Sequence, residues 1–254
     1  MNPILSMSLM PVSGDGAARA VAVQSSSPTN SFDDRLPDYI KSSPPGLKPL
    51  EPAVLTLVMA IYRHDPDTLA HSWRVAGLCV YLYRRLLEEG QRKVPLDDLY
   101  SAALLHDIGK VTVPSDLLQA PRSLQVEERT LVQKHAAEGG RMLQSLRGPL
   151  KALACSLAVS HHECWNGSGY PVGLPSRLLP LHCRIAGLMD VFDALASPRA
   201  YKPGWPLDKL VALFVAQAGK QFDPKLINRL APYWTSLLQE HGRLMDITLD
   251  TPSS

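Results

Sequence analysis

From residue 51 onward, apolar residues recur at helical spacing almost everywhere, and this spacing is what most limits the fold of the chain. One face of the first such segment carries Val54, Leu55, Val58, Ile61 and Tyr62. No segment alternates convincingly between apolar and polar residues, as a strand with one exposed face would. The pattern therefore predicts an all-α chain, in which helices bury their apolar faces against one another.

About eight helices fit the pattern, and Gly and Pro mark many of the breaks between them. The first begins near Glu51, with Pro52 in a position that suits the first turn of a helix. The others are expected over residues 67–89, 95–109, 127–146, 150–162, 181–196, 207–218 and 224–240. The last two would form a C-terminal helical extension of the bundle.

Residues 1–48 differ from the rest because they are rich in Pro and Ser and carry little periodic apolar surface. Such a segment buries too few apolar groups to offset the entropy lost on ordering. We therefore expect a flexible tail over residues 1–48, followed by one domain over residues 49–254. The stretch from Phe32 to Ile40 is more apolar, and a short piece of the tail can dock there.

The composition of the 254 residues excludes several classes of protein. A net charge of +2 gives no electrostatic reason to expect nucleic-acid binding. No apolar run approaches the roughly 18 residues that span a bilayer, and no basic residue precedes Arg19 as a secretory signal would require. The four cysteines are far apart and form no CxxC pair, which favours a reduced, cytoplasmic protein.

Histidines and aspartates at predicted helix ends and on inward helix faces are the main candidates for chemistry, and the chain has eight histidines. Alone, each would most simply be a hydrogen-bonded structural residue, and His64, His182 and His241 are interpreted in that way. Seven others stand out together, because an unpartnered polar group in an apolar helix is costly. Mixed imidazole and carboxylate ligands suit iron, manganese or zinc rather than calcium. These seven residues are His71, His106, Asp107, His135, His161, His162 and Asp190.

The order of several motifs resembles the HD-GYP family, a subset of the HD-domain metal-dependent phosphohydrolases. The matching segments are His106-Asp107-Ile108-Gly109-Lys110, His135 with Gly139, residues 161–171 with Gly169-Tyr170-Pro171, residues 190–195, residues 199–202 and residues 219–224. The His-Asp pair alone would be a weak signal, but a dozen matched positions in one order are highly specific. The resemblance extends from about His71 to Pro224 and implies the helical bundle of an HD domain.

The resemblance implies a centre with two divalent metal ions, most often iron or manganese. His71, His106, Asp107 and Asp190 would hold one ion, and Asp107 would bridge to a second held by His135, His161 and His162. Members with a third metal carry a glutamate where this chain has the shorter Asp67, so two metals are favoured. Two ions about 3.5–4 Å apart can activate water and bind phosphate oxygens, and a shell of mostly neutral histidines leaves positive charge for a phosphodiester.

Six residues are candidates for contacts with a phosphodiester substrate. Lys110 can stabilise charge on a phosphate oxygen, or it can be an ordinary lysine at a helix end. Arg199 and Lys202 are candidates for a second phosphate, or for an ordinary basic loop. Gly169, Tyr170 and Pro171 are expected to shape the pocket, to dock signalling proteins, or only to form a turn. Asp193, one helical turn after Asp190, is expected to brace the fold or a ligand.

We therefore expect a cyclic di-GMP phosphodiesterase that forms the linear dinucleotide or GMP, with Asp107 and Lys110 in catalytic roles. One alternative is a related enzyme that acts on another cyclic dinucleotide or nucleotide. The other is a silent protein that binds a dinucleotide or a partner, whose signature would be lost metal ligands. None of the expected ligands is lost here. The sequence does not indicate the oligomeric state, the input signal or the metal.

Overall fold

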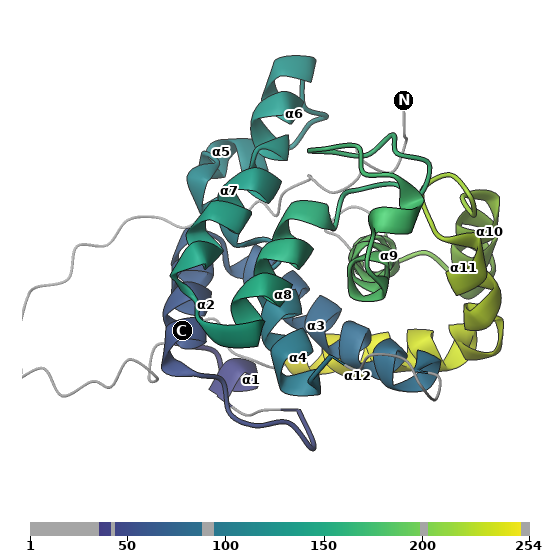
Figure 1. Ribbon diagram of the computed structural model, residues 1–254, viewed down its shortest axis with the longest axis horizontal. Coiled ribbons are helices and arrows are strands. Elements are labelled where there is room, and N and C mark those ends of the chain that lie inside the picture. The colour runs from purple at the N-terminus through teal and green to yellow at the C-terminus, as the bar shows by residue number, and fades with distance from the viewer. Residues whose placement is uncertain (1–35, 42–43, 88–93, 199–202, 250–254) are drawn as a thin grey trace, which may run out of the picture.

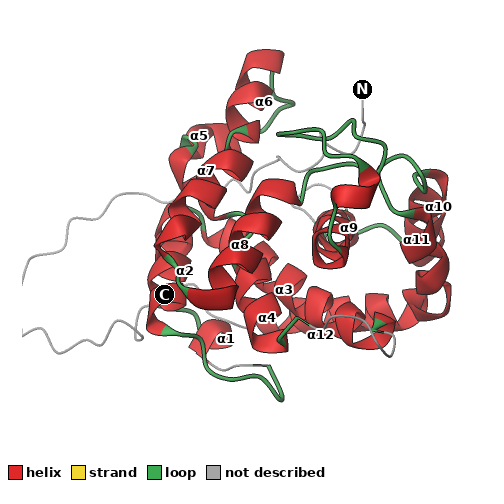
Figure 2. Cartoon of the chain, viewed as in Figure 1, coloured by secondary structure: helices red, strands yellow, loops and turns green. Residues whose placement is uncertain are grey.

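The computed structural model describes residues 36–41, 44–87, 94–198 and 203–249 (Figure 1). Helices are the only extended regular elements within these ranges, which confirms the all-α prediction (Figure 2). The α-helices are α1 Asp38–Lys41, α2 Pro52–His64, α3 Pro66–Leu86, α4 Leu96–Leu104, α5 Ser115–Leu118, α6 Val126–Gln133, α7 His135–Met142, α8 Gly148–Ser160, α9 Leu181–Ala196, α10 Leu207–Ala216, α11 Pro224–Leu230 and α12 Trp234–Leu249. Short 3₁₀ turns are η2 Ile108–Thr112, η3 Leu143–Ser145, η4 Ser176–Leu178 and η5 Ala231–Tyr233.

Two of the expected helices are each divided in the structure. The segment 127–146 breaks into α6 and α7 at Lys134, where the ring of His135 bonds to the carbonyl of Val132 at 2.6 Å and competes with the helical ladder. The segment 224–240 breaks into α11 and α12 across η5, which contains Pro232 and so lacks one backbone donor. Helix α9 has the bounds expected from the sequence.

Helix α3 is the centre of the core and packs against α4, α9 and α12 (Figure 1). Its start is fixed by Asp65, whose carboxylate accepts hydrogen bonds from the backbone and hydroxyl of Thr68, and by Pro66 in the first turn. Helix α8 packs against α4, α7 and α9. The ends of these helices thereby come together on one side of the core, and this arrangement positions the candidate site.

The packed core begins ahead of the domain boundary expected at residue 48. Leu36, Tyr39 and Ile40 are buried in the same cluster as the residues of α3, and the ring of Tyr39 lies 5.2 Å from that of Trp73. The rest of the expected tail, residues 1–35 and 42–43, lies outside the described residues. The docking expected for the stretch ending at Ile40 is thus seen in its described part.

The described residues include all four cysteines and most of the helical part of the chain. All four cysteines are free thiols, and three of them, Cys79, Cys164 and Cys183, are buried. Within the ranges that the structure describes, no helix is both long enough and apolar enough to cross a bilayer.

Candidate metal centre

The turn after α4 places two adjacent polar side chains in the interior. The helix ends at Leu104, and the chain continues through 3₁₀-type bonds from His106 N to Ala103 O and from Ile108 N to Leu105 O, at 3.3 and 3.1 Å. This tightened geometry changes the usual angle between neighbouring side chains. His106 and Asp107 are therefore both buried, each with 1% of its surface exposed.

Helix α7 reaches this turn because Gly109 has no side chain. A Cβ atom on Gly109 would lie 1.9 Å from the carbonyl oxygen of His135 and 2.5 Å from the backbone nitrogen of Gly139. Any larger residue would push α7 away. The close approach brings the His135 Nε2 atom to 3.3 Å from the Asp107 Oδ1 atom.

The seven predicted ligands form two groups, and in each group the potential ligand atoms lie within 4.8 Å of one another. The first group contains His71 of α3, His106 and Asp190 of α9. The second contains Asp107 with His135, His161 and His162. The Asp107 carboxylate lies between the groups, because its Oδ2 is 3.4 Å from His106 Nε2 while its Oδ1 faces His135. The structure thus brings together all seven residues that were predicted from the sequence as metal ligands.

Backbone carbonyls fix the rings of three of these histidines. The Nδ1 atoms of His106, His135 and His161 donate to Ala103 O at 2.8 Å, Val132 O at 2.6 Å and Ala158 O at 2.9 Å. A neutral ring in this tautomer has its lone pair on Nε2, and each of the three Nε2 atoms lies within 3.6 Å of an oxygen of Asp107. Neutral imidazoles held in this way are the form that binds a metal.

Two buried atoms at the centre of the cluster have no hydrogen-bond partner among the residues that the structure describes: His106 Nε2 and Asp107 Oδ1. An unpaired polar atom in the interior costs about 1–3 kcal/mol, so such atoms call for a ligand. Both atoms can donate an electron pair to a first-row divalent cation. The residues present therefore fit two divalent ions, with His71, His106 and Asp190 around one, His135, His161 and His162 around the other, and Asp107 between them.

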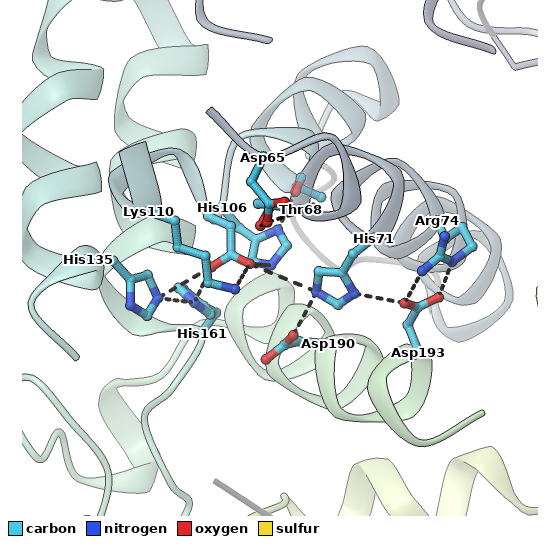
Figure 3. A network of polar contacts seen from close by, with 12 residues as sticks. Asp65, Thr68, His71, Arg74, His106, Lys110, His135, His161, Asp190 and Asp193 are labelled. Atoms are coloured by element: carbon cyan, nitrogen blue, oxygen red, sulfur yellow. Dashed lines mark hydrogen bonds and ion pairs between the residues drawn. The ribbon is translucent and has the colours of Figure 1, made fainter. Parts of the chain in front are cut away.

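Each of the two ring nitrogens of His71 contacts a different carboxylate (Figure 3). Its Nδ1 atom lies 2.7 Å from Asp193 Oδ2 and its Nε2 atom 3.0 Å from Asp190 Oδ1. Burial alone would lower the pKa of His71, but these two carboxylates raise it to about 9. In the absence of a cation, a proton therefore occupies the Nε2 position that a metal would take, and metal binding at this group displaces it.

Lys110 forms an ion pair with Asp107, with 2.5 Å between Nζ and Oδ2. Burial would raise the pKa of Asp107, but Lys110 and His106 hold it well below its usual range. Burial likewise would lower the pKa of Lys110, but Asp107 and Asp190 raise it. Both groups are therefore charged at neutral pH, and the ammonium is held beside the metal-binding cluster.

The pKa values of two histidines in the second group are low. Burial is the largest cause for both His135 and His162, and for His135 the Asp107 carboxylate partly opposes it. The pKa of His162 is lowered most, because His161 and His135 lie beside it. Both rings are therefore neutral at physiological pH, which keeps their lone pairs available to a cation.

The Gly-Tyr-Pro loop, residues 163–175, packs against this second group. The ring of Tyr170 stacks on that of His162, with 4.7 Å between the ring centroids. A Cβ atom on Gly169 would lie 2.3 Å from the backbone nitrogen of Cys164, so the loop closes this tightly only with glycine there. The Tyr170–Pro171 peptide bond is cis. The loop thus places an aromatic ring directly over a candidate ligand.

Glu163 stabilises the C-terminal part of the same loop, residues 172–174. Its buried carboxylate accepts backbone N–H bonds from Val172, Gly173 and Leu174, at 2.8, 3.1 and 2.9 Å. No separate role was predicted for this residue, although it directly follows the His161-His162 pair. Its contacts identify it as the residue that holds the loop in shape.

Other residues singled out in the sequence lie apart from the two groups. Asp67 is exposed and belongs to neither group of potential ligands. His64 bonds to the carbonyl of Val113 at 2.9 Å, in line with its structural interpretation. Arg199 and Lys202 lie outside the described residues, so their contact with a second phosphate stays a prediction.

Two residues that support His71 through Asp193 were not predicted from the sequence. Arg74 and His241 both contact Asp193, the aspartate that holds the His71 ring. Arg74 had a usable signal, since it follows His71 by three residues and so shares its helix face. His241 had none, because a single histidine in a C-terminal helix carries no spacing that relates it to residue 71.

Comparison with known families gives a match to the family described as HD domain over residues 56–226. A 3'3'-cGAMP-specific phosphodiesterase 2 of Vibrio cholerae is 35% identical over 196 residues, covering 76% of this chain and 36% of its own. The cyclic di-GMP phosphodiesterase response regulator RpfG of Xanthomonas campestris is 39% identical over 177 residues, covering 68% and 45%. This chain therefore matches less than half the length of either relative.

Among solved structures, the cyclic GMP-AMP specific phosphodiesterase V-cGAP3 of V. cholerae aligns with a TM-score of 0.50 and 22% identity. The alignment covers 77% of this chain and 53% of the other, and it supports the fold alone. The family match covers the elements that carry all seven candidate ligands. With its His-Asp, His-His and Gly-Tyr-Pro motifs in their expected order, the chain belongs to the HD domain family and to its HD-GYP type.

Proposed function

We propose that this chain hydrolyses a phosphodiester bond of a cyclic dinucleotide at a centre for two divalent metal ions, with cyclic di-GMP as the substrate. The observation that carries the proposal is the position of Asp107, whose two oxygens face two separate groups of potential ligands. Two divalent cations would supply Lewis acidity toward a phosphate oxygen and would lower the pKa of an attacking water.

The chain's own residues would prepare the site for an anionic substrate. The carbonyl bonds to His106, His135 and His161 hold these rings in place before any ligand arrives. Only two of the seven candidate ligands are carboxylates, Asp107 and Asp190, so a loaded centre would keep positive charge toward a phosphodiester. Burial of the cluster strengthens that attraction, because interactions between charges are less screened away from water.

Lys110 is proposed as a catalytic residue that stabilises charge on the phosphate. Its ammonium lies 2.5 Å from Asp107 and is largely buried, so it is fixed near the reacting group. A fixed donor of this kind typically contributes about 10²–10³-fold to the rate constant. Gly169, Tyr170 and Pro171 are proposed to shape the pocket beside it, since the ring of Tyr170 covers His162.

A specific observation favours a second substrate, 3'3'-cGAMP. One of the relatives described above bears the name of a phosphodiesterase specific for that dinucleotide, and it matches a longer part of this chain than RpfG does. The two substrates share the phosphodiester ring and differ in one base. The metal-binding groups would treat both alike, so the base contacts decide between them.

The experiment that tests the function is anaerobic purification with metal analysis, followed by chromatography of products from each dinucleotide. We expect about two divalent ions per chain, most simply iron or manganese, and conversion of cyclic di-GMP to the linear dinucleotide or GMP. Faster turnover of 3'3'-cGAMP would support the second substrate. Tight binding of a dinucleotide by the metal-loaded chain without any turnover would contradict hydrolysis and support a silent binding protein.

A further inference from the structure

The carboxylate of Asp193 is fully buried and contacts three side chains of two helices. Two of these side chains, His71 and Arg74, are seen beside it in Figure 3. Its Oδ2 accepts from His71 Nδ1 at 2.7 Å and from Arg74 Nη2 at 2.9 Å. Its Oδ1 accepts from Arg74 Nε at 2.7 Å and lies 3.1 Å from His241 Nε2. An ionised carboxylate offers about four acceptor positions, so these four contacts occupy them all.

His241 comes from α12, the last described helix. It is 3% exposed, and its Nε2 atom also lies 3.2 Å from Ser197 Oγ, so its ring is fixed against the C-terminal part of α9. Helix α12 lies close to α3, because Gly77 leaves room for Leu244, which would be 3.0 Å from a Cβ atom there. Residues 234–249 lie beyond residue 226, where the family match ends.

We propose that His241 is a positioning residue for the metal ligand His71, acting through Asp193, so that helix α12 sets the metal affinity of the group formed by His71, His106 and Asp190. The inference rests on the proposed metal centre. A ligating histidine commonly donates its second N–H to a carboxylate that fixes its orientation. Without His241, Arg74 leaves one acceptor position on Asp193 Oδ1 unfilled in the interior. The carboxylate can then turn, and the His71 ring that it holds turns with it.

The test measures binding of Mn²⁺ to the full chain by competition with a chromophoric chelator. His241→Met removes the N–H donor at similar volume, whereas His241→Gln keeps an N–H near the same place. We expect His241→Met to weaken one of two Mn²⁺ equivalents by about 10–100-fold and to leave the other unchanged. His241→Gln is expected to remain within about threefold of the unaltered chain, since the donor is retained.

A matched control separates positioning from general packing. Leu237→Ala opens a cavity in the same buried face of α12 without touching Asp193, so it should lower the melting temperature of the metal-free chain without weakening Mn²⁺ binding. Equal weakening by Leu237→Ala and His241→Met at equal loss of melting temperature would overturn the inference. Unchanged Mn²⁺ binding in a folded His241→Met chain would overturn it as well.

A double-mutant cycle tests the route through His71. Added to His71→Gln, the change His241→Met should cause less than about a twofold further loss of Mn²⁺ affinity, because the ring it positions is already absent. A further loss as large as in the unaltered chain would overturn the route. Failure of the unaltered chain to bind Mn²⁺ at all would instead overturn the proposed metal centre, and the two failures are therefore distinguishable.

Discussion

The ring of Tyr170 stacks on the ring of His162, with 4.7 Å between the centroids and 28° between the planes. His162 belongs to the second group of potential metal ligands, so the middle residue of the Gly-Tyr-Pro motif directly contacts the candidate metal centre. Turn chemistry alone left a structural turn as an equal alternative for this motif. The stacking instead indicates that the loop helps to hold a ligand ring in place.

Replacing Tyr170 tests that contact. Tyr170→Ala removes the stacked ring and should weaken binding of one metal equivalent on the order of 2- to 10-fold, the range for losing an aromatic pair. Tyr170→Phe keeps the ring and should leave metal affinity unchanged. Mn²⁺ titration of the three chains checks this expectation. Identical affinities for Tyr170→Ala and the unaltered chain would show that the stacking does not support His162.

Asp107 is the residue that faces both groups of potential metal ligands. Asp107→Ala should abolish hydrolysis and reduce bound metal from two equivalents to fewer than one, because a single carboxylate faces both groups. Metal analysis of the purified variant, with Asp116→Ala as an exposed carboxylate control on α5, measures the effect. Two retained equivalents would contradict the bridging assignment.

Loss of Asp107 also leaves the buried Lys110 ammonium without its partner, at a cost of about 3–5 kcal/mol. If Asp107→Ala failed to fold, its loss of bound metal would not report on the role of Asp107 as a ligand. The double change Asp107→Asn with Lys110→Met removes both charges together, so it should regain most of that stability while still failing to bind two metals. Thermal unfolding of the single and double variants separates the two effects.

Four of the seven ligand candidates carry a local signal in the sequence, and the order of the HD-GYP motifs relates the other three to them. His106-Asp107 and His161-His162 each follow an apolar helical segment directly, and helix ends are where side chains can face a common site. The helices themselves were predictable for the same reason, since an apolar face repeats within a few residues. The break at Lys134 was not, because it arises from the bond between the His135 ring and Val132 O.

The support behind His71 could not be predicted from local pattern. His71 and His241 lie on α3 and α12, and both contact the carboxylate of Asp193, on a third helix. The pairing of helices depends on the fit of their whole faces, such as Leu244 of α12 against Gly77 of α3. No short sequence motif predicts that pairing. The early start of the core has a similar cause, since Tyr39 is held by Trp73 from α3.

The start of the core predicts different outcomes for two truncations. A chain beginning at residue 36 should unfold at the same temperature as the full chain, because residues 1–35 are Pro- and Ser-rich in sequence. A chain beginning at residue 48 loses Leu36, Tyr39 and Ile40 from the core, and each buried side chain contributes about 1.5–3 kcal/mol. Thermal unfolding should therefore show a drop only for the shorter chain. Equal melting temperatures for the two truncations would mean that these side chains add nothing to stability.

His182 gives the folded chain a dependence on pH that is separate from the metal centre. Burial, with a contribution from Arg184, lowers the pKa of His182 to about 4, whereas an unfolded histidine titrates near 6.5. Between these values the unfolded chain binds more protons than the folded chain. The free energy of unfolding therefore falls as the pH drops through this window, and the contribution of His182 is fully present above about pH 6.5.

Replacing His182 should flatten that dependence. His182→Gln and His182→Phe both remove the titrating group, so each should lose less stability than the unaltered chain between about pH 7 and about pH 4.5. Urea unfolding at both pH values, with chelator present so that metal release does not contribute, measures the difference. The two variants differ in size and polarity, so a shared flattening can come only from the lost titration. Parallel pH profiles for all three chains would show that His182 is protonated as readily in the folded chain as in the unfolded one.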